Sequence, residues 1–421
     1  MINIKVPEHN FLVKKISVKD LILPKPMKRF NYSIFYFLII IICSCEFSDS
    51  NQNKPEDNVP QLNTSIDIAN VVSIDTFQNA LGQFISGMDC SYFNAESNID
   101  SLYWKDYSSR VNRAFSKMKK NRLEPMREWM MNISSDKVND TSLLFYPFSG
   151  ADFLHANYLF PEANDYILLA QEKIGDIPDI SSLKNGEYKN YLNAVDLSLS
   201  DIYKRSYFIT KTMQNDTKRG AELNGLLPLF YWFIARTDHE IIDVSRIYVD
   251  SFSTVKKNIN NSTVAEDLIE GVKFVFRKCG AEKIKTMTYF NCDISNKGFA
   301  KNPEFKKYLT LIRASNSFVK SASYLMHYST FSEIRDLLQQ KSNAILEDDT
   351  GIPYKYFNTL EWDVNLFGVY VMPIKDFSET RFQQDLEDAY SDDAQYKGEM
   401  PFSLGYHWSS RKQNQMLYIK K

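Results

Sequence analysis

The fold class of this chain follows from residues 143–170, which read LLFYPFSGADFLHANYLFPEANDYILLA. Leu143–Phe148 is a short apolar run typical of a buried strand, and Ser149–Asp152 supplies a turn and a helix start. Phe153–Phe160 then fits a short helix, the polar stretch after it breaks the pattern, and Tyr166–Ala170 predicts a second buried strand. A strand, a helix and a strand in so short a span predict a βαβ crossover, whose two strands lie parallel.

Amphipathic patterns on both sides of this unit predict helices, because apolar residues recur there at helical spacing. The ranges concerned are 74–85 with Ser73 as its cap, 107–118, 126–133, 188–202, 226–235 and 305–340. The range 226–235 is apolar all round and too short to span a bilayer, so we interpret it as a buried helix.

Strand composition occurs at 240–250 and 366–374, and a hairpin is expected from 272–276 and 285–291. We therefore expect an α/β fold, with a mixed sheet, the βαβ crossover at 143–170, helices on both faces and a hairpin in the second half. Residues 66–421 are long enough to bury a substantial core and are expected to form a single large domain, with a subdivision near 237–260 left open.

The overall charge is close to neutral, with 50 basic and 52 acidic side chains and a net charge of −2. No block of Lys and Arg suggests a nucleic-acid footprint, so no nucleic-acid partner is expected. In the predicted hairpin Cys279 lies near the turn and Cys292 at the open end, so we expect no disulfide bond between them.

Residues 27–45 have the pattern of a secretory signal. Lys28 and Arg29 form a basic start, and Ile34–Ile42 is an apolar run too short to span a bilayer. Ser44 is small and precedes Cys45, as in the signals of bacterial lipoproteins, so Cys45 is the predicted site of lipidation. An uncleaved anchor helix is the alternative.

The segments on either side of this signal are expected to lie outside the fold. Residues 1–26 have no role in the scheme, so Met27 is the expected start, and the polar stretch 46–65 is typical of a flexible tether. The signal that ends at Cys45 and the tether after it predict a domain anchored by lipid to the outer membrane, on its periplasmic side or at the cell surface.

Several segments resemble a family of uncharacterised bacterial lipoproteins, mostly from Bacteroidetes. The first is Phe145–Phe153, with the pattern Phe-Tyr-Pro-Phe-Ser-Gly-x-Asp-Phe. The others are Pro178–Asp179, Ser321–His327, Asp348–Tyr354 and Pro401–Trp408, so the resemblance covers most of the mature chain. It implies a lipoprotein and no particular activity.

The main candidate ligand site is the loop Ser149–Asp152. A turn between a strand and a helix places free N–H groups at the carboxyl edge of a sheet, where α/β proteins commonly bind ligands, and Gly150 lets a ligand approach the backbone. Glu172 ends the second strand, where nucleotide-binding folds carry an acidic residue for ribose. We expect a solvent-reachable cleft beside this loop, bordered by Glu172. The alternative is that Ser149 or Asp152 caps the helix.

Three histidines are weaker candidates. His155 shares a helix face with Asp152, but no third partner is identifiable and Ser149 lies outside a Gly-x-Ser-x-Gly elbow, so no catalytic residue is assigned. His327 is expected to be a hydrogen-bonded core histidine. His407, beside Trp408 and with Tyr406 and Tyr354 nearby, is expected to line an aromatic pocket.

Two acidic segments are weighed as cation sites. Asp238–Glu240, which includes His239, is better interpreted as a cation-stabilised helix end. Glu347–Gly351 is better interpreted as a solvated acidic turn, because the spacing of its acidic residues is not that of an EF-hand. No metal is predicted, since neither His-Glu-x-x-His nor Cys-x-x-Cys occurs.

These observations favour a lipid-anchored envelope protein whose α/β domain binds a small-molecule or protein partner. The alternatives are an enzyme with a nucleotide-like cofactor or substrate at the 149–152 loop, and a purely structural envelope lipoprotein.

Overall fold

The computed structural model describes residues 73–94, 99–208, 223–258, 268–377 and 379–421. All of these belong to one compact unit, Pro60–Lys421. The predicted signal at 27–45, Cys45 and the predicted tether at 46–65 lie outside the described residues.

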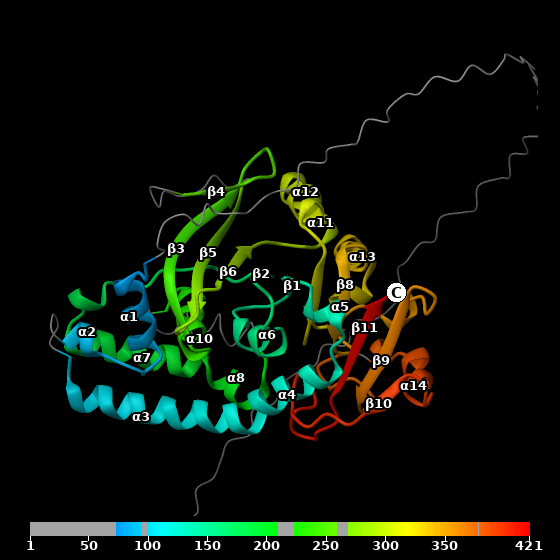
Figure 1. Ribbon diagram of the computed structural model, residues 1–421, viewed down its shortest axis with the longest axis horizontal. Coiled ribbons are helices and arrows are strands. Elements are labelled where there is room, and N and C mark those ends of the chain that lie inside the picture. Colours follow the sequence, from blue (N-terminus) through cyan, green and yellow to red (C-terminus); the bar gives the residue numbers. More distant parts are fainter. Residues whose placement is uncertain (1–72, 95–98, 209–222, 259–267, 378) are drawn as a thin grey trace, which may run out of the picture. The chain divides into compact units, whose positions relative to one another are not determined.

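The centre of the fold is an 11-stranded mixed sheet in the order β10-β9-β11-β8-β7-β1-β2-β6-β5-β3-β4 (Figure 1). The strands are β1 Leu143–Pro147, β2 Asp165–Ala170, β3 His239–Val249, β4 Val255–Lys257, β5 Ile269–Lys278, β6 Ile284–Asn291, β7 Ser315–Val319, β8 Ser342–Glu347, β9 Trp362–Gly368, β10 Tyr396–Gly398 and β11 Asn414–Lys420.

Five neighbouring strands in the middle, β8-β7-β1-β2-β6, run parallel. The predicted crossover is confirmed, because β1 and β2 are direct parallel neighbours with Leu143 opposite Asp165. After β1 the chain adds β2 beside it, continues to β3 and β4 at one edge of the sheet, and returns through β5 to β6 beside β2. It later crosses to the other side of β1 to add β7 and β8. The boundary between β1 and β7 is therefore a topological switch point.

Helices cover both faces of the sheet, and alternate residues of β1 show the two faces directly. Leu144 and Tyr146 belong to one apolar core, and Leu143 and Phe145 belong to the other. The first core includes α1 Thr76–Ile85, α3 Ser101–Met118, α4 Glu124–Ile133, α6 Phe153–Leu159, α7 Asn185–Ser198, α8 Ser200–Arg205 and α10 Leu227–Arg236. The second includes α11 Asn296–Lys301, α12 Pro303–Leu311, α13 Ser332–Lys341 and α14 Gln384–Tyr390, and Figure 1 shows α11, α12 and α13 across the sheet from α3.

The remaining helical elements are short. They are α2 Ser91–Asn94, α5 Asp136–Asn139, a π-helical turn at Lys119–Leu123, and 3₁₀ turns at Ile180–Ser182, Leu325–His327, Ser329–Phe331, Tyr354–Tyr356 and Glu379–Arg381. None of the helices in the described part of the chain is long and apolar enough to cross a membrane.

Three sequence expectations about elements are wrong in detail. Asp75, not Ser73, caps α1, because its carboxylate accepts from the backbone N–H of Gln78 at 3.0 Å. The long helix expected over 188–202 is split at Leu199 into α7 and α8. The helical region expected over 305–340 contains the buried strand β7, and β8 and β11 carried no prediction.

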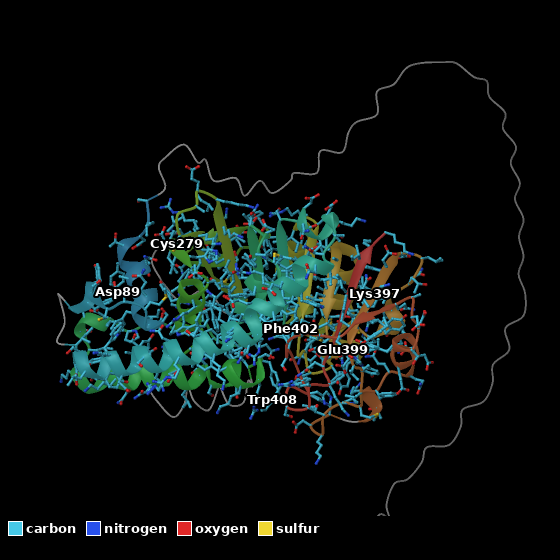
Figure 2. All side chains as sticks on the ribbon, turned by 60° about the horizontal axis from the view of Figure 1, so that its bottom comes forward. Asp89, Cys279, Lys397, Glu399, Phe402 and Trp408 are labelled. Atoms are coloured by element: carbon cyan, nitrogen blue, oxygen red, sulfur yellow. The ribbon has the colours of Figure 1, made fainter. Side chains whose placement is uncertain are left out.

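The hairpin is confirmed in β5 and β6, which pair antiparallel. Cys279, labelled in Figure 2, is exposed just after β5, and Cys292 is buried just after β6. Both are free thiols at opposite ends of β6. The strand predicted at 366–374 is β9, which begins earlier and ends at Gly368, where φ is +80°.

Candidate functional site

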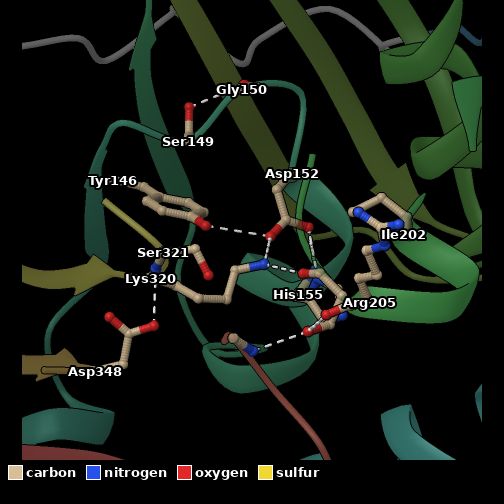
Figure 3. Close-up of polar contacts among 12 residues, drawn as sticks. Tyr146, Ser149, Gly150, Asp152, His155, Ile202, Arg205, Lys320, Ser321 and Asp348 are labelled. Carbon is tan, nitrogen blue, oxygen red and sulfur yellow. Dashed lines mark hydrogen bonds and ion pairs between the residues drawn. The ribbon is translucent and has the colours of Figure 1, made fainter. Parts of the chain in front are cut away.

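Polar side chains gather where the central parallel strands end. Phe148–Asp152 follows β1, Lys320 and Ser321 follow β7, and Asp348–Thr350 follows β8. Because these strands are parallel, their carboxyl ends share one edge of the sheet, which is the edge where open α/β sheets bind ligands. Figure 3 shows side chains from β1, from α6 and from the segments that follow β7 and β8 converging at this edge.

A buried ionic network occupies the switch point between β1 and β7. Lys320 Nζ donates to Asp152 Oδ2 at 2.6 Å and also to the carbonyl of Ser206. His155 Nδ1 lies 2.7 Å from Asp152 Oδ1, and the Tyr146 hydroxyl donates to Asp152 Oδ2 at 3.2 Å. The side chains of Asp152 and Lys320 are each only 2% exposed, so this ion pair is shielded from water.

The protonation states in this network follow from burial and pairing. Burial by itself would raise the pKa of Asp152, but the adjacent His155 and Lys320 outweigh it and lower the pKa to about 2. Burial lowers the pKa of His155 to about 4, although Asp152 opposes this shift. His155 is therefore neutral at neutral pH and its Nδ1–H faces the carboxylate. Its buried Nε2 has no hydrogen-bond partner within the described ranges.

The acidic segment 347–349, at the end of β8, is buried, which corrects the expectation of a solvated turn. Glu347 is 0% exposed, Asp348 3% and Asp349 5%. Burial raises the pKa of Glu347 well above its usual value, and burial together with the nearby Asp349 raises the pKa of Asp348 to about 7. β7, β11 and the C-terminal loops enclose these three carboxyl groups, so the turn is shielded from solvent.

Backbone N–H groups and side chains surround these carboxyl groups. Asp348 accepts from the N–H of Ser321 at 2.8 Å, and Asp349 accepts from the Tyr324 hydroxyl at 2.6 Å and from Asn414 Nδ2 at 2.9 Å. Two glycines make room for the cluster: a Cβ on Gly351 would lie 2.2 Å from Glu347 Oε2, and one on Gly405 would lie 2.7 Å from Asp348 Oδ2. Over the residues that the structure describes, no group of three or more His, Cys, Asp or Glu is arranged to hold a metal ion.

Unusual backbone conformations concentrate at the same edge. Nine non-glycine residues of the described chain have positive φ, and six of them lie at or beside this cluster: Phe148, Ser206, Ser321, Ser323, Tyr324 and His407. Each such conformation costs on the order of 1–3 kcal/mol and persists only where the surrounding structure enforces it, which is common at binding and active sites.

Two segments, 206–208 and 405–407, cover this edge. The N–H of Gly405 donates to Ser206 Oγ at 2.9 Å, the rings of Tyr207 and Tyr406 lie 4.9 Å apart, and the Tyr406 hydroxyl donates to the carbonyl of Ser321 at 3.2 Å. We call these two segments the cover.

The solvent-reachable cleft predicted beside the 149–152 loop is closed in this structure. Ser149 is 4% exposed and Asp152 1%, and a Cβ on Gly150 would meet the ring of Phe208 at 3.4 Å. The Ser149 hydroxyl donates hydrogen bonds to the carbonyls of Gly150 and Leu169, with Oγ–O distances of 2.9 and 3.3 Å. The alternative prediction that Asp152 caps the helix is confirmed, because Asp152 Oδ1 accepts from the N–H of His155 at 3.3 Å at the start of α6.

Glu172 lies just beyond β2. Its carbonyl accepts from the Tyr289 hydroxyl and from Asn291 Nδ2, both at 2.6 Å and both from β6. The side chain that faces Asp152 is instead Lys320, from β7.

The other predicted histidines have distinct environments. His327 Nε2 lies 3.3 Å from the carbonyl of Asp349, which fits a hydrogen-bonded core histidine, and burial lowers its pKa to about 4. His407 is half-buried in the cover. Tyr354, which was expected near His407, donates its hydroxyl hydrogen bond to Gln395 Oε1 at 2.7 Å. His239 does not stabilise a helix end as a cation: it is buried in β3 between Phe153 and Phe276, and burial lowers its pKa to about 3.

Sequence reasoning missed Lys320, Tyr146 and Asn414. Lys320 directly follows the run Ser-Asn-Ser-Phe-Val, whose polar residues conceal a central strand, and Asn414 begins a strand that carried no prediction. If the strand at 315–319 had been recognised as parallel, the lysine at its carboxyl end would have indicated a site residue.

No protein-family model, no curated protein and no solved structure matches this chain.

Proposed function

We propose that this chain is a lipid-anchored protein of the bacterial cell envelope whose α/β domain binds a ligand at the carboxyl ends of β1, β7 and β8. The observation that carries the ligand site is the convergence of buried ionisable groups and positive-φ residues at a topological switch point. Burying Asp152, Lys320 and the acidic segment 347–349 costs free energy that an apolar edge would not incur.

The polar atoms of this edge indicate what kind of ligand fits. Asp152 and Lys320 neutralise each other at 2.6 Å, so neither offers an uncompensated charge. Glu347 Oε1 and Ser321 Oγ join His155 Nε2 as buried polar atoms that have no partner in the described part of the chain. This set favours a polar, hydrogen-bonding ligand without a large net charge, and the cover must move for such a ligand to enter.

The anchor rests on the signal pattern of residues 27–45. Metabolic labelling with a fatty-acid analogue should mark the wild type and the matched control Cys43→Ala, but not Cys45→Ala. The unlabelled variant should also leave the membrane fraction. Equal labelling of Cys45→Ala and wild type would contradict the anchor.

The ligand site is tested by a thermal-shift screen of the full-length chain in detergent against uncharged sugars, with nucleotides and phosphorylated metabolites as the charged comparison. Each hit is then measured with Ser321→Ala and with the exposed control Ser329→Ala. Alanine retains the backbone of Ser321, whose φ is +51°, and removes only the unpartnered Oγ. We expect the shift to fall in Ser321→Ala alone. A shift unchanged in that variant would place the site elsewhere.

A second candidate is an enzyme that takes a nucleotide-like cofactor or substrate at the 149–152 loop, where the cover must first move because Ser149 and Gly150 are buried. It is favoured by the position of β1 at the switch point, where dinucleotide-binding folds hold their ligand. A nucleotide hit that is lost in Glu172→Gln as well as in Ser321→Ala would support it. A screen without any hit would favour a purely structural envelope lipoprotein.

A further inference from the structure

The chain that follows β9 leaves apolar side chains at the surface. Residues 369–374 read Val-Tyr-Val-Met-Pro-Ile and belong to the apolar run that predicts a strand, but β9 ends at Gly368 and these residues have no regular structure. Val369 is 37% exposed and Met372 44% exposed. Packing in the sheet therefore does not account for the apolar character of this segment.

The segment that leads into β11 lies beside it. The N–H of Val369 donates to the carbonyl of Gln413 at 2.8 Å, and the ring centroids of Phe377 and Tyr406 are 5.3 Å apart. Trp408 lies between these two contacts along the chain, directly after the cover, and is 37% exposed. The two segments are thus joined at both ends and form one surface. We call it the apolar rim, and it consists of Val369, Val371, Met372, Ile374 and Trp408.

The charged groups of the same two segments are mainly cations. Lys375, Arg411 and Lys412 are exposed, and Asp376 is the single carboxylate within 369–376 and 408–412. Strand β10 and the residue after it add one charge of each sign. Trp, aliphatic side chains and excess cations together are typical of surfaces that rest on anionic phospholipid. The cores of protein–protein interfaces are instead depleted in charged residues.

The predicted anchor allows this face to reach a bilayer. Residues 46–72, which number 27, separate Cys45 from Ser73, the first residue that the structure describes. A chain of this length spans at most about 90 Å, whereas a globular domain of this size is about 50 Å across. Any face of the domain can therefore touch the membrane, and the high effective concentration makes even a weak surface contact persist.

We infer that the apolar rim rests on an anionic phospholipid bilayer. Trp408 and Met372 lie among the lipid headgroups, and Lys375, Arg411 and Lys412 lie against the phosphates. This orientation turns the cover, and with it the carboxyl-edge site, towards the membrane. The inference rests on the proposed lipid anchor.

The tryptophans of the chain provide the probe. Trp129, Trp232 and Trp362 are each at most 7% exposed, Trp104 in α3 is half-buried, and Trp408 is the most exposed of the five. The lipidated full-length protein is reconstituted into vesicles of phosphatidylglycerol and of phosphatidylcholine brominated near the top of its acyl chains. Bromine quenches the emission of tryptophan that contacts the bilayer. We expect quenching of the wild type that vanishes in Trp408→Phe and remains in the matched control Trp104→Phe.

A second pair of variants tests the charges. Arg411→Glu/Lys412→Glu should reduce the quenching at least about twofold, because each cation near an anionic surface adds to the attraction. Replacing phosphatidylglycerol by zwitterionic lipid should act in the same direction. Lys278→Glu/Lys283→Glu is the control, since these exposed lysines belong to the β5–β6 turn, and Figure 2 shows Cys279 of this turn well apart from Trp408.

Flotation with the vesicles tests the anchor, whereas quenching of Trp408 tests the apolar rim. Protein that floats with unquenched Trp408 overturns the inference and leaves the anchor intact, and a wild type that does not float contradicts both. Quenching that survives Trp408→Phe, or that ignores both changes of charge, also overturns the inference. A wild-type dimer in detergent that becomes a monomer in Met372→Asp would assign the apolar rim to a second copy of the chain instead.

Discussion

Replacement of Lys320 by methionine removes the cation that faces Asp152 while leaving a side chain of similar length in β7's carboxyl-end turn. Both partners are 2% exposed and 2.6 Å apart, so the variant leaves a buried carboxylate without its counter-charge. Breaking a buried pair in this way costs about 3–5 kcal/mol. We expect the lower part of that range at neutral pH, because His155 and Tyr146 still bond to the carboxylate.

The loss should depend on pH through His155. In the wild type the pKa of His155 is about 4, below its ordinary 6.5, so the unfolded chain takes up a proton here as pH falls through this window and stability decreases. Without Lys320, His155 can be protonated beside Asp152 and its pKa rises, which reduces that acid-side decrease. At about pH 5 the loss caused by the variant should therefore shrink by up to about 2 kcal/mol.

Urea denaturation of wild type and Lys320→Met at about pH 7.5 and pH 5 measures both effects. Lys189→Met is the control, because it breaks the Lys189–Asp100 pair, whose side chains are 31% and 35% exposed. The control should lose far less stability, since water and salt screen an exposed pair. A loss below about 1 kcal/mol in Lys320→Met, or a loss independent of pH, would refute the buried network as described.

Three further predictions use other parts of the fold. Burial raises the pKa of Asp348 from 3.8 to about 7, so the stability contributed by the protonated carboxyl group is lost as pH rises through this window. Urea midpoints should therefore fall less with rising pH in Asp348→Asn than in the wild type. Equal pH dependence of the midpoint in the two proteins would contradict this prediction. Gly351→Ala should lower the stability measured by thermal unfolding by roughly 1–3 kcal/mol, because the new Cβ meets buried Glu347 Oε2. The control Gly186→Ala should be neutral or slightly stabilising, because Gly186 has open space around it. Iodoacetamide should alkylate exposed Cys279 in the native protein but 4% exposed Cys292 only on unfolding, and a peptide linking the two cysteines would be inconsistent with the hairpin.

Local sequence patterns are enough to specify the centre of this protein. The apolar runs of β1 and β2, the turn between them and the short helix are local patterns, set by side-chain period and turn chemistry, so they could be identified without knowing any partner. The hairpin of β5 and β6 followed from the same kind of signal. The sequence also indicated that the 149–152 loop lies at a carboxyl edge, and it offered helix capping by Asp152 as the alternative to ligand binding.

The surroundings of that loop depend on segments that are distant along the chain. Lys320 lies 168 residues from Asp152 along the chain, and the two meet because β7 is inserted beside β1. Ser315, Asn316 and Ser317 give β7 a polar sequence, yet all its residues are buried. Likewise the sequence pattern of the acidic residues at the end of β8 predicts a solvated turn, whereas in the structure β11 and the cover enclose these residues. Burial and pKa depend on contacts between distant segments, and such contacts leave no periodic signal in the chain.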